Sequence, residues 1–161
     1  MEISRYNKSC QIWKLENDML LSIPIKGLSY ESDYLILKKD GELQIKAEYA
    51  WNGCSPKAKI FGMVFGTPEG ALPLEHEKRI ISRNLDALGI GALPWDKPKT
   101  YFASLVHDCL YQISDTHPKK LDRRKVDRLF YRILRAYRFL PASLYYLFVR
   151  IFGKYFWGSK S

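Results

Sequence analysis

The stretch YFASLVHDCLY, residues 101–111, decides how this chain folds. Pro98 precedes it, and its apolar side chains recur at spacings of three and four, which is the pattern of an amphipathic helix. The residues on this stripe are Ala103, Val106, His107, Leu110 and Tyr111. Because such a helix must bury its apolar stripe, we expect the rest of the helical half to pack around it.

Two further helices are expected after this one. Asp122 suits the N-cap of the first, whose apolar stripe consists of Val126, Leu129, Phe130, Ile133, Leu134 and Tyr137. The second begins at Pro141, because proline is tolerated in a first helical turn, and it carries Leu144, Tyr145, Leu147, Phe148, Ile151, Phe152 and Tyr155. Arg150 and Lys154 interrupt this apolar segment, and its uncharged run is too short to span a bilayer. We predict a packed core helix; a helix at a membrane interface is the alternative.

The first third of the chain indicates a small antiparallel sheet. Short apolar runs between turn signals predict strands at Gln11–Leu15, Leu20–Ile25, Tyr34–Lys38 and Leu43–Tyr49. The connection Lys39-Asp40-Gly41 predicts a hairpin, because Asp-Gly supplies the positive φ angles that a tight turn needs.

These elements predict an α+β fold, with a small antiparallel sheet in the N-terminal third packed with a C-terminal bundle of three or four helices. The length of 161 residues suits a single domain. Within it, residues 1–50 are β-rich and residues 99–157 are helical. Residues 51–98 hold most of the Gly and Pro, which predicts loops with one helix at Leu74–Leu88.

Cysteine usage and the N-terminus bear on the compartment. The three cysteines, Cys10, Cys54 and Cys109, are an odd number at irregular spacing, so we expect free thiols and a reducing environment. The first residues lack the basic and apolar regions of a signal peptide, which favours the cytoplasm.

The net charge of +9 is concentrated on the helix that follows Asp122. Its candidate basic face comprises Arg124, Arg128, Arg132 and Arg135. A solvated helix face is the favoured interpretation, because most runs of charge are no more than that. An anionic partner, either lipid or nucleic acid, is the alternative.

His107 and Asp127 form the first candidate site. His107 is expected to face inward, where its ring needs a hydrogen-bond partner. Asp108 is its neighbour in sequence and points about 100° away around the helix, so the partner must come from elsewhere. If the two helices pack antiparallel, Asp127 can hold one ring nitrogen and leave the other for a water or substrate. This is the arrangement of a histidine general base, and a satisfied core histidine is the alternative.

The second candidate site is the turn Trp51–Pro56. Oxygen atoms of Asn52 and Gly53, together with the carboxylate of Asp108, would suit a hard cation such as calcium. A plain turn after the last strand is the simpler alternative. His76 and His117 lack the spacing of a zinc site, and Cys54 and Cys109 form no Cys-x-x-Cys pair.

Several motifs, taken in order, resemble a known family. They are Trp51–Pro56, Gly66–Pro68, the segment Ala103–Tyr111 with its His-Asp-x-x-Tyr pattern, Arg124, Asp127, Phe130 and Tyr131, the segment Val149–Gly153, and Trp157. Over roughly residues 45–157, the chain resembles the small phage and prophage proteins grouped as domain of unknown function 1353. The resemblance implies a viral or prophage origin and a location in the host cytoplasm or the virion. It implies no reaction, since that family has no settled activity.

The same helix pair is similar to the catalytic core of calcium-dependent secreted phospholipases. That similarity implies His107 as general base, Asp127 as orienting acid, Asp108 as calcium ligand and Gly53 as part of the cation loop. Tyr111, the last residue of the His-Asp-x-x-Tyr pattern, joins this candidate set. The chain departs from those enzymes in lacking their disulfides, in the position of Cys109 and in having a single glycine in the loop.

Together these features predict a phage-type hydrolase that cleaves an ester-type bond with a His107-activated water. The alternative is a non-enzymatic virion or host-interaction module, such as an anti-defence protein, in which His107, Asp108 and Asp127 form a buried polar network. The substrate or host protein stays open. A water-accessible His107 would favour the enzyme, and a sealed one the module.

Overall fold

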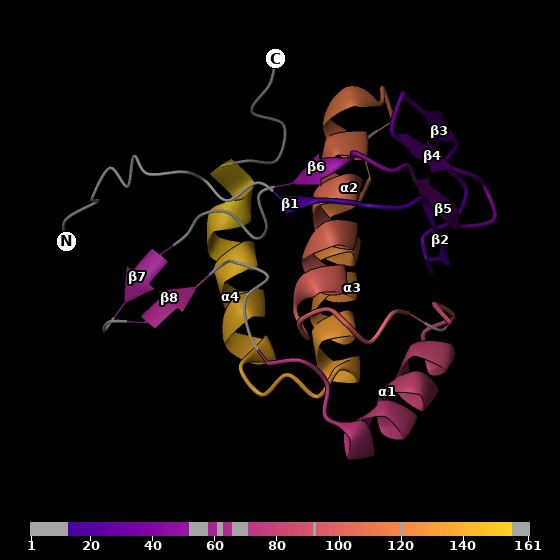
Figure 1. Ribbon diagram of the computed structural model, residues 1–161. Coiled ribbons are helices and arrows are strands. Elements are labelled where there is room, and N and C mark those ends of the chain that lie inside the picture. The colour runs from indigo at the N-terminus through magenta and orange to yellow at the C-terminus, as the bar shows by residue number, and fades with distance from the viewer. Residues whose placement is uncertain are drawn as a thin grey trace.

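The computed structural model describes residues 13–51, 58–60, 63–65, 71–91, 93–119 and 121–155, with backbone alone for 58–60, 63–65 and 155. The fold is α+β, as predicted. Figure 1 shows the four strands within residues 19–45 on one side of the paired helices α2 (Tyr101–Thr116) and α3 (Arg123–Ala136), and α4 (Ala142–Phe152) on the other side. The start of the strand predicted at Gln11–Leu15 and the turn residues Asn52 and Gly53 lie outside the described residues.

The main sheet has four antiparallel strands in the order β2-β5-β4-β3. Their bounds are β2 Met19–Ser22, β3 Tyr30–Glu31, β4 Leu35–Leu37 and β5 Glu42–Ile45. The register places Leu43 opposite both Leu21 and Leu37, so these three buried side chains form one row across the sheet. This row results from the alternation in β5, because every second residue of a strand faces the same side.

Two short pairings accompany the main sheet. β1 (Trp13–Lys14) pairs antiparallel with β6 (Ala50–Trp51), and β7 (Ala58–Ile60) pairs with β8 (Met63–Phe65). The strands are shorter than predicted, since the segment Leu43–Tyr49 leaves the ladder after Ile45. The sequence patterns missed β3, β6, β7 and β8.

The hairpin between β4 and β5 turns at Lys39-Asp40-Gly41, as predicted. The Gly41 amide donates to the Lys38 carbonyl (3.0 Å), and the Lys38 amide donates to the Glu42 carbonyl (2.8 Å). The turn type differs from the expectation that both Asp40 and Gly41 adopt positive φ. Gly41 does so, at +94°, whereas Asp40 instead accepts the Glu42 amide through its carboxylate (3.1 Å). A three-residue loop with one left-handed glycine needs no second positive φ.

Gly41 provides a test of this turn. A Cβ atom at this position would collide with the Ile23 carbonyl oxygen. The substituted residue would also have to keep the left-handed φ of Gly41. We expect Gly41→Ala to lower the free energy of unfolding by about 2–3 kcal/mol, measured by urea denaturation. Gly27→Ala is the matched control, because Gly27 has a φ of +88° but open space around it, and should cost about 1 kcal/mol. Equal losses in the two variants would contradict the close approach at Gly41.

The four α-helices in the described ranges begin and end close to the predicted positions. They are α1 (Glu75–Ala87), α2 (Tyr101–Thr116), α3 (Arg123–Ala136) and α4 (Ala142–Phe152), and a 3-10 turn, Gly153–Tyr155, follows α4. Asp122 caps α3 as predicted, because its carboxylate accepts the Arg124 amide at 2.9 Å. Pro141 is the N-cap residue of α4 and so stands one place before the first turn.

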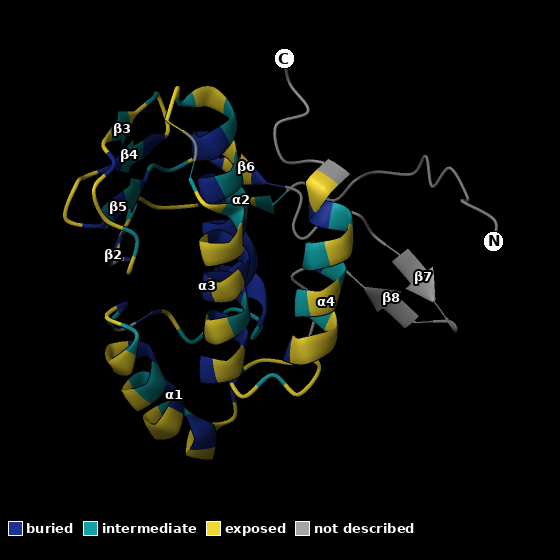
Figure 2. Ribbon diagram, turned by 180° about the vertical axis from the view of Figure 1, so that it is seen from behind, coloured by how far each residue is buried: buried dark blue, intermediate teal, exposed yellow. Residues whose placement is uncertain are grey.

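Helix α2 is buried on nearly every side, which the amphipathic pattern did not predict (Figure 2). Besides the expected stripe, it buries Tyr101, Phe102, Ser104, Leu105, Cys109, Ile113 and Ser114. Trp51 packs edge-on against Tyr101, with ring centroids 5.1 Å apart, and its indole donates to the Ser104 hydroxyl (3.4 Å). The β1–β6 pair therefore covers the start of α2.

The prediction of α4 as a packed core helix was wrong in extent. Only Ala142 and Val149 are buried within α4, whereas Leu144, Leu147 and Ile151 are exposed. The helix contacts α3 along one side, where Tyr131 and Tyr146 have ring centroids 5.1 Å apart. None of the helices in the described ranges combines the length and the apolar character needed to cross a membrane.

Candidate active site between α2, α3 and α4

Helices α2 and α3 pack antiparallel, which brings the candidate residues together. Pairs of contacting side chains run in opposite directions along the two helices: Phe102 stacks with Tyr137, His107 lies against Phe130, and Tyr111 bonds Asp127. The six residues between the helices are too few for any but a hairpin connection. The contact predicted between His107 and Asp127 depends on this arrangement, and it is present.

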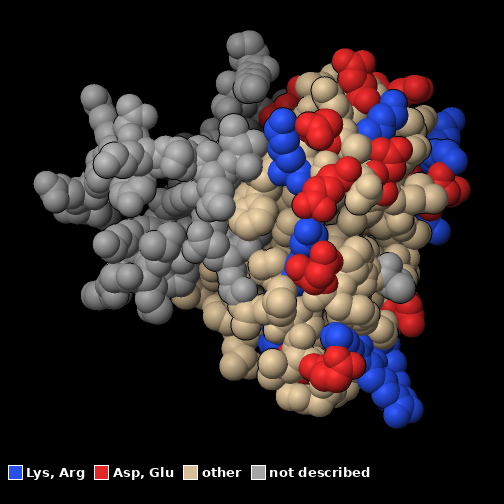
Figure 3. Space-filling view, viewed as in Figure 1, with Lys and Arg blue, Asp and Glu red and all other residues tan. Residues whose placement is uncertain are grey.

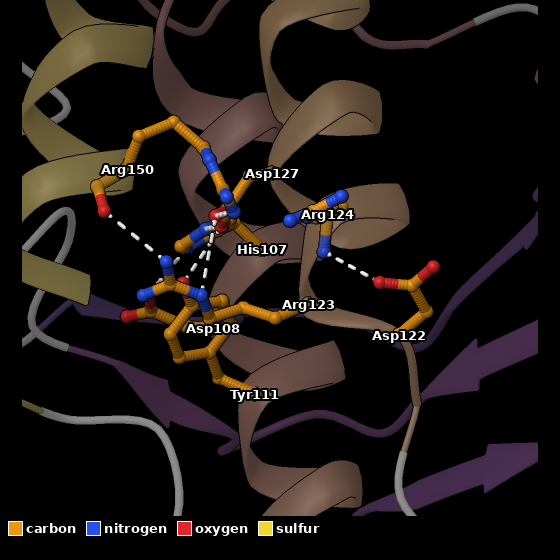
Figure 4. A network of polar contacts seen from close by, with 8 residues as sticks. All are labelled: His107, Asp108, Tyr111, Asp122, Arg123, Arg124, Asp127 and Arg150. Atoms are coloured by element: carbon orange, nitrogen blue, oxygen red, sulfur yellow. Dashed lines mark hydrogen bonds and ion pairs between the residues drawn. The ribbon is translucent and has the colours of Figure 1, made fainter. Parts of the chain in front are cut away.

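Asp127 is the centre of the site, and its side chain is fully buried (Figure 4). Its Oδ1 lies 3.0 Å from His107 Nε2 and accepts the Tyr111 hydroxyl at 2.7 Å. Its Oδ2 accepts Arg150 Nη1 at 2.8 Å and lies 3.8 Å from Arg123 Nε. We call these five residues the Asp127 cluster. Helices α2, α3 and α4 each contribute to it.

Asp127 is a carboxylate anion in this cluster. Burial alone would raise its pKa, but the hydrogen bonds from His107, Tyr111 and Arg150 together lower the pKa below its usual value. An ionised carboxylate has no proton to donate, so His107 Nε2 must carry the hydrogen of the 3.0 Å bond. The bond therefore fixes the tautomer of the ring.

His107 has its second nitrogen directed toward Asp108. Nδ1 lies 3.8 Å from Asp108 Oδ1, which is within ion-pair distance but too long for a hydrogen bond. Burial works to lower the pKa of His107, and the carboxylates of Asp108 and Asp127 outweigh it, so the pKa is raised. Tyr111 and Phe130 flank the ring at centroid distances of 4.1 and 4.9 Å and hold its orientation.

Two partly exposed side chains border this site, Asp108 beside His107 and Arg150 beside Asp127. His107 is 5% exposed and Asp127 is 0% exposed, whereas the Asp108 side chain is 20% exposed. His107 Nδ1 thus faces a side chain that is itself partly exposed. Burial nonetheless raises the pKa of Asp108, and the His107 ring works against that rise.

Gly153 closes the cluster at the end of α4. A Cβ atom there would lie 2.6 Å from the Tyr111 hydroxyl and 3.4 Å from Arg123 Nη1, so any larger residue would displace the Tyr111 side chain from this position. Arg123 Nη2 donates to the Arg150 carbonyl (3.1 Å), which ties α3 to the end of α4. Arg123 Nη1 is buried and has no hydrogen-bond partner in the described part of the chain.

Two members of the cluster were not predicted as site residues. Arg123 precedes Asp127 by four positions, a spacing that places both on one helix face, so this pair could have been found from the sequence. Arg150 carried no such signal, because its role depends on how α4 packs. The arginine that interrupts the apolar segment of α4 is the one that reaches Asp127.

The remaining predicted site residues divide into two groups. Asn52 and Gly53, the predicted partners of Asp108 for a cation, lie outside the described residues, and no cluster of three His, Cys, Asp or Glu residues suitable for a metal occurs within them. The basic-face residues Arg124, Arg128, Arg132 and Arg135 are exposed and do not belong to the cluster.

Cys109 is a free, buried cysteine. Burial raises the pKa of its thiol, which leaves little thiolate and makes it a poor nucleophile. Its prediction as a free thiol is confirmed, whereas Cys10 and Cys54 lie outside the residues that the structure describes.

No family model, curated protein or solved structure matches this chain. The chemistry open to the protein is therefore inferred from the geometry of the Asp127 cluster.

Proposed function

We propose that the protein is a phage-type hydrolase that cleaves an ester-type bond with a water activated by His107. One observation carries the proposal. His107 Nε2 is fixed on the buried, ionised Asp127, and its Nδ1 is free of that bond and faces Asp108, whose side chain is 20% exposed. A neutral imidazole oriented by a carboxylate in this way is suited to general-base catalysis.

The reaction would proceed by direct attack of water. The Nδ1 lone pair takes a proton from the water as its oxygen bonds to the ester carbonyl carbon. The charge of Asp127 stabilises the imidazolium that forms, while Tyr111 and Arg150 hold that carboxylate in place. The proton on Nδ1 then passes to the alkoxide as the bond to the leaving group breaks.

Asp108 is the calcium ligand in this proposal. Its carboxylate is the hard oxygen ligand that calcium prefers, and the turn at Asn52 and Gly53 is our proposal for the remaining ligands. A bound calcium ion would supply positive charge for the carbonyl oxygen of the substrate.

A non-enzymatic module for the virion or for a host protein is the second candidate. The observation in its favour is that His107 is nearly sealed, at 5% exposure, and that Asp127 is completely buried. By the criterion of water access to His107 stated above, this observation favours the module. In that case the Asp127 cluster would serve to fix the orientation of the three helices. The protein would then bind its partner through another surface.

A pH–rate profile tests the hydrolase. The base acts only when neutral, so the raised pKa of His107 predicts a rate of p-nitrophenyl ester hydrolysis that rises with pH and reaches half its maximum above 6.5. Asp108→Asn removes a carboxylate that raises this pKa and should shift the midpoint to lower pH. Asp86→Asn, on the exposed face of α1, is the control and should leave the midpoint unchanged.

The same midpoint should be seen without turnover, by an NMR titration of the His107 ring protons. A folded protein that hydrolyses none of a series of short- to long-chain esters, with or without calcium, would favour the non-enzymatic module. A rate whose midpoint does not follow the NMR titration would remove His107 as the base.

A further inference from the structure

The outer face of α3 is built from basic residues alone. Every exposed residue of this helix is Arg or Lys: Arg124, Lys125, Arg128, Arg132 and Arg135. The opposite face supplies Val126, Leu129, Phe130, Ile133 and Leu134 to the core. We call the four arginines of the outer face the arginine stripe. They recur at spacings of four, four and three residues and so follow one line along the helix, about 6 Å apart for each four-residue step.

The arginine stripe is not neutralised by any residue that the structure describes. Within the described ranges, none of its guanidinium groups makes an ion pair, whereas Lys14, Lys38, Lys78, Lys97 and Lys99 each pair with an acid. On the face seen in Figure 3, acidic and basic side chains are interspersed. Figure 2, seen from behind, places α3 in front with its exposed residues toward the viewer.

The position of these charges works against the helix itself. Three basic residues, Arg123, Arg124 and Lys125, occupy the first turn of α3, and no acidic residue lies there. The N-terminal end of a helix carries partial positive charge, so cations are unfavourable at this end. Asp122 offsets this as N-cap. A helix face needed only for solubility would not require this arrangement.

We propose that the arginine stripe binds the phosphate backbone of double-stranded DNA. Guanidinium groups bind phosphate oxygens in a bidentate manner, and a rigid row of them matches a regular row of phosphates. The inference goes beyond the proposed hydrolase and does not depend on it, because the stripe and the Asp127 cluster occupy different sides of α3.

Other polyanions fit this face less well. Proteins that bind single strands stack bases on exposed aromatic rings. The aromatic residues of α3 are Phe130, which is buried, and Tyr131, which is half-buried against Tyr146. Double-stranded RNA is recognised through its 2′-hydroxyls, and the exposed face of α3 carries no hydroxyl or amide side chain for that purpose. A helix that lies in a lipid surface inserts apolar residues beside its charges, and α3 itself exposes none.

The test is binding of a fluorescent duplex DNA of about 20 base pairs, followed by anisotropy over a series of salt concentrations. The stripe variant is R124Q/R128Q/R132Q/R135Q. The matched control is K26Q/K39Q/R79Q/R83Q, which removes four exposed charges from other elements and lowers the net charge of +9 equally. Circular dichroism confirms that each variant is folded.

We expect the stripe variant to lose more than about tenfold in affinity, and the slope of log affinity against log salt to fall by about 3 to 4. The control variant should stay within about threefold of the parent, and His107→Asn should bind like the parent. Equal losses in stripe and control variants would overturn the proposal, since overall charge would then explain binding. Tighter binding to a single strand, to duplex RNA or to phosphatidylserine vesicles than to duplex DNA would also overturn it.

Discussion

Asp127→Ala is expected to lower the free energy of unfolding by about 3–5 kcal/mol, because it leaves the partly buried guanidinium groups of Arg123 and Arg150 without their anion and the buried His107 without its acceptor. The carboxylate is fully buried and accepts hydrogen bonds from His107, Tyr111 and Arg150. Arg123 lies 3.8 Å away and would lose the same counter-charge. Chemical denaturation followed by circular dichroism measures the loss.

Asp122→Ala is the matched control for this variant, because it removes another carboxylate from the same helix. Asp122 is exposed and caps α3 through one bond to the Arg124 amide, so its loss should cost about 1 kcal/mol. If Asp127→Ala costs no more than this control, the Asp127 cluster does not hold the helices together. The orienting role proposed for Asp127 would then fail as well.

His107→Asn should lower ester hydrolysis by about a hundredfold or more while leaving the melting temperature nearly unchanged. Asparagine keeps a donor for Asp127 but has no titratable nitrogen, and proton transfer by a positioned side chain is worth about that factor. The initial rate of hydrolysis and the thermal unfolding curve are measured on the same preparation. If His107 serves packing alone, stability should fall by about 1–3 kcal/mol and any activity should fall only with the folded fraction.

His117→Asn is the control for this variant. His117 follows the end of α2 and bonds the backbone of Lys119 through its Nδ1, away from the Asp127 cluster. It should retain the rate of the parent. A His107→Asn protein that melts well below the parent and keeps its specific activity per folded molecule would exclude His107 as the base.

The helical half could be predicted because its signals are local. The stripe from Ala103 to Tyr111, the cap at Asp122 and the proline at 141 each act within one or two turns of helix. The His107–Asp127 contact followed from two of these helices and a short connection, which leaves few ways to pack. Burial on the other sides of α2 depends on what covers it, and no periodicity in α2 itself reveals that.

The sheet was predicted less well because its pairings are not local. β6 exists because Trp51 lies opposite Trp13, far away in sequence, and two residues carry no period of their own. The prediction that α4 is a packed core helix was wrong in extent for a related reason. Its composition is apolar all round, which does not distinguish a helix in a core from one that contacts its neighbour along a single side.

The attachment of α4 has a consequence for how the molecule opens. With only Ala142 and Val149 fully buried and Tyr145 and Tyr146 partly so, this helix buries less apolar surface than α2 or α3. The contacts of Arg150 and Gly153 with the Asp127 cluster add to its attachment. Segments with few buried apolar contacts form the cooperative units that detach first, well before global unfolding. Detachment of α4 would carry Arg150 away from Asp127 and admit water to a carboxylate that is otherwise sealed. The hydration of the Asp127 carboxylate and the attachment of helix α4 are thus thermodynamically linked.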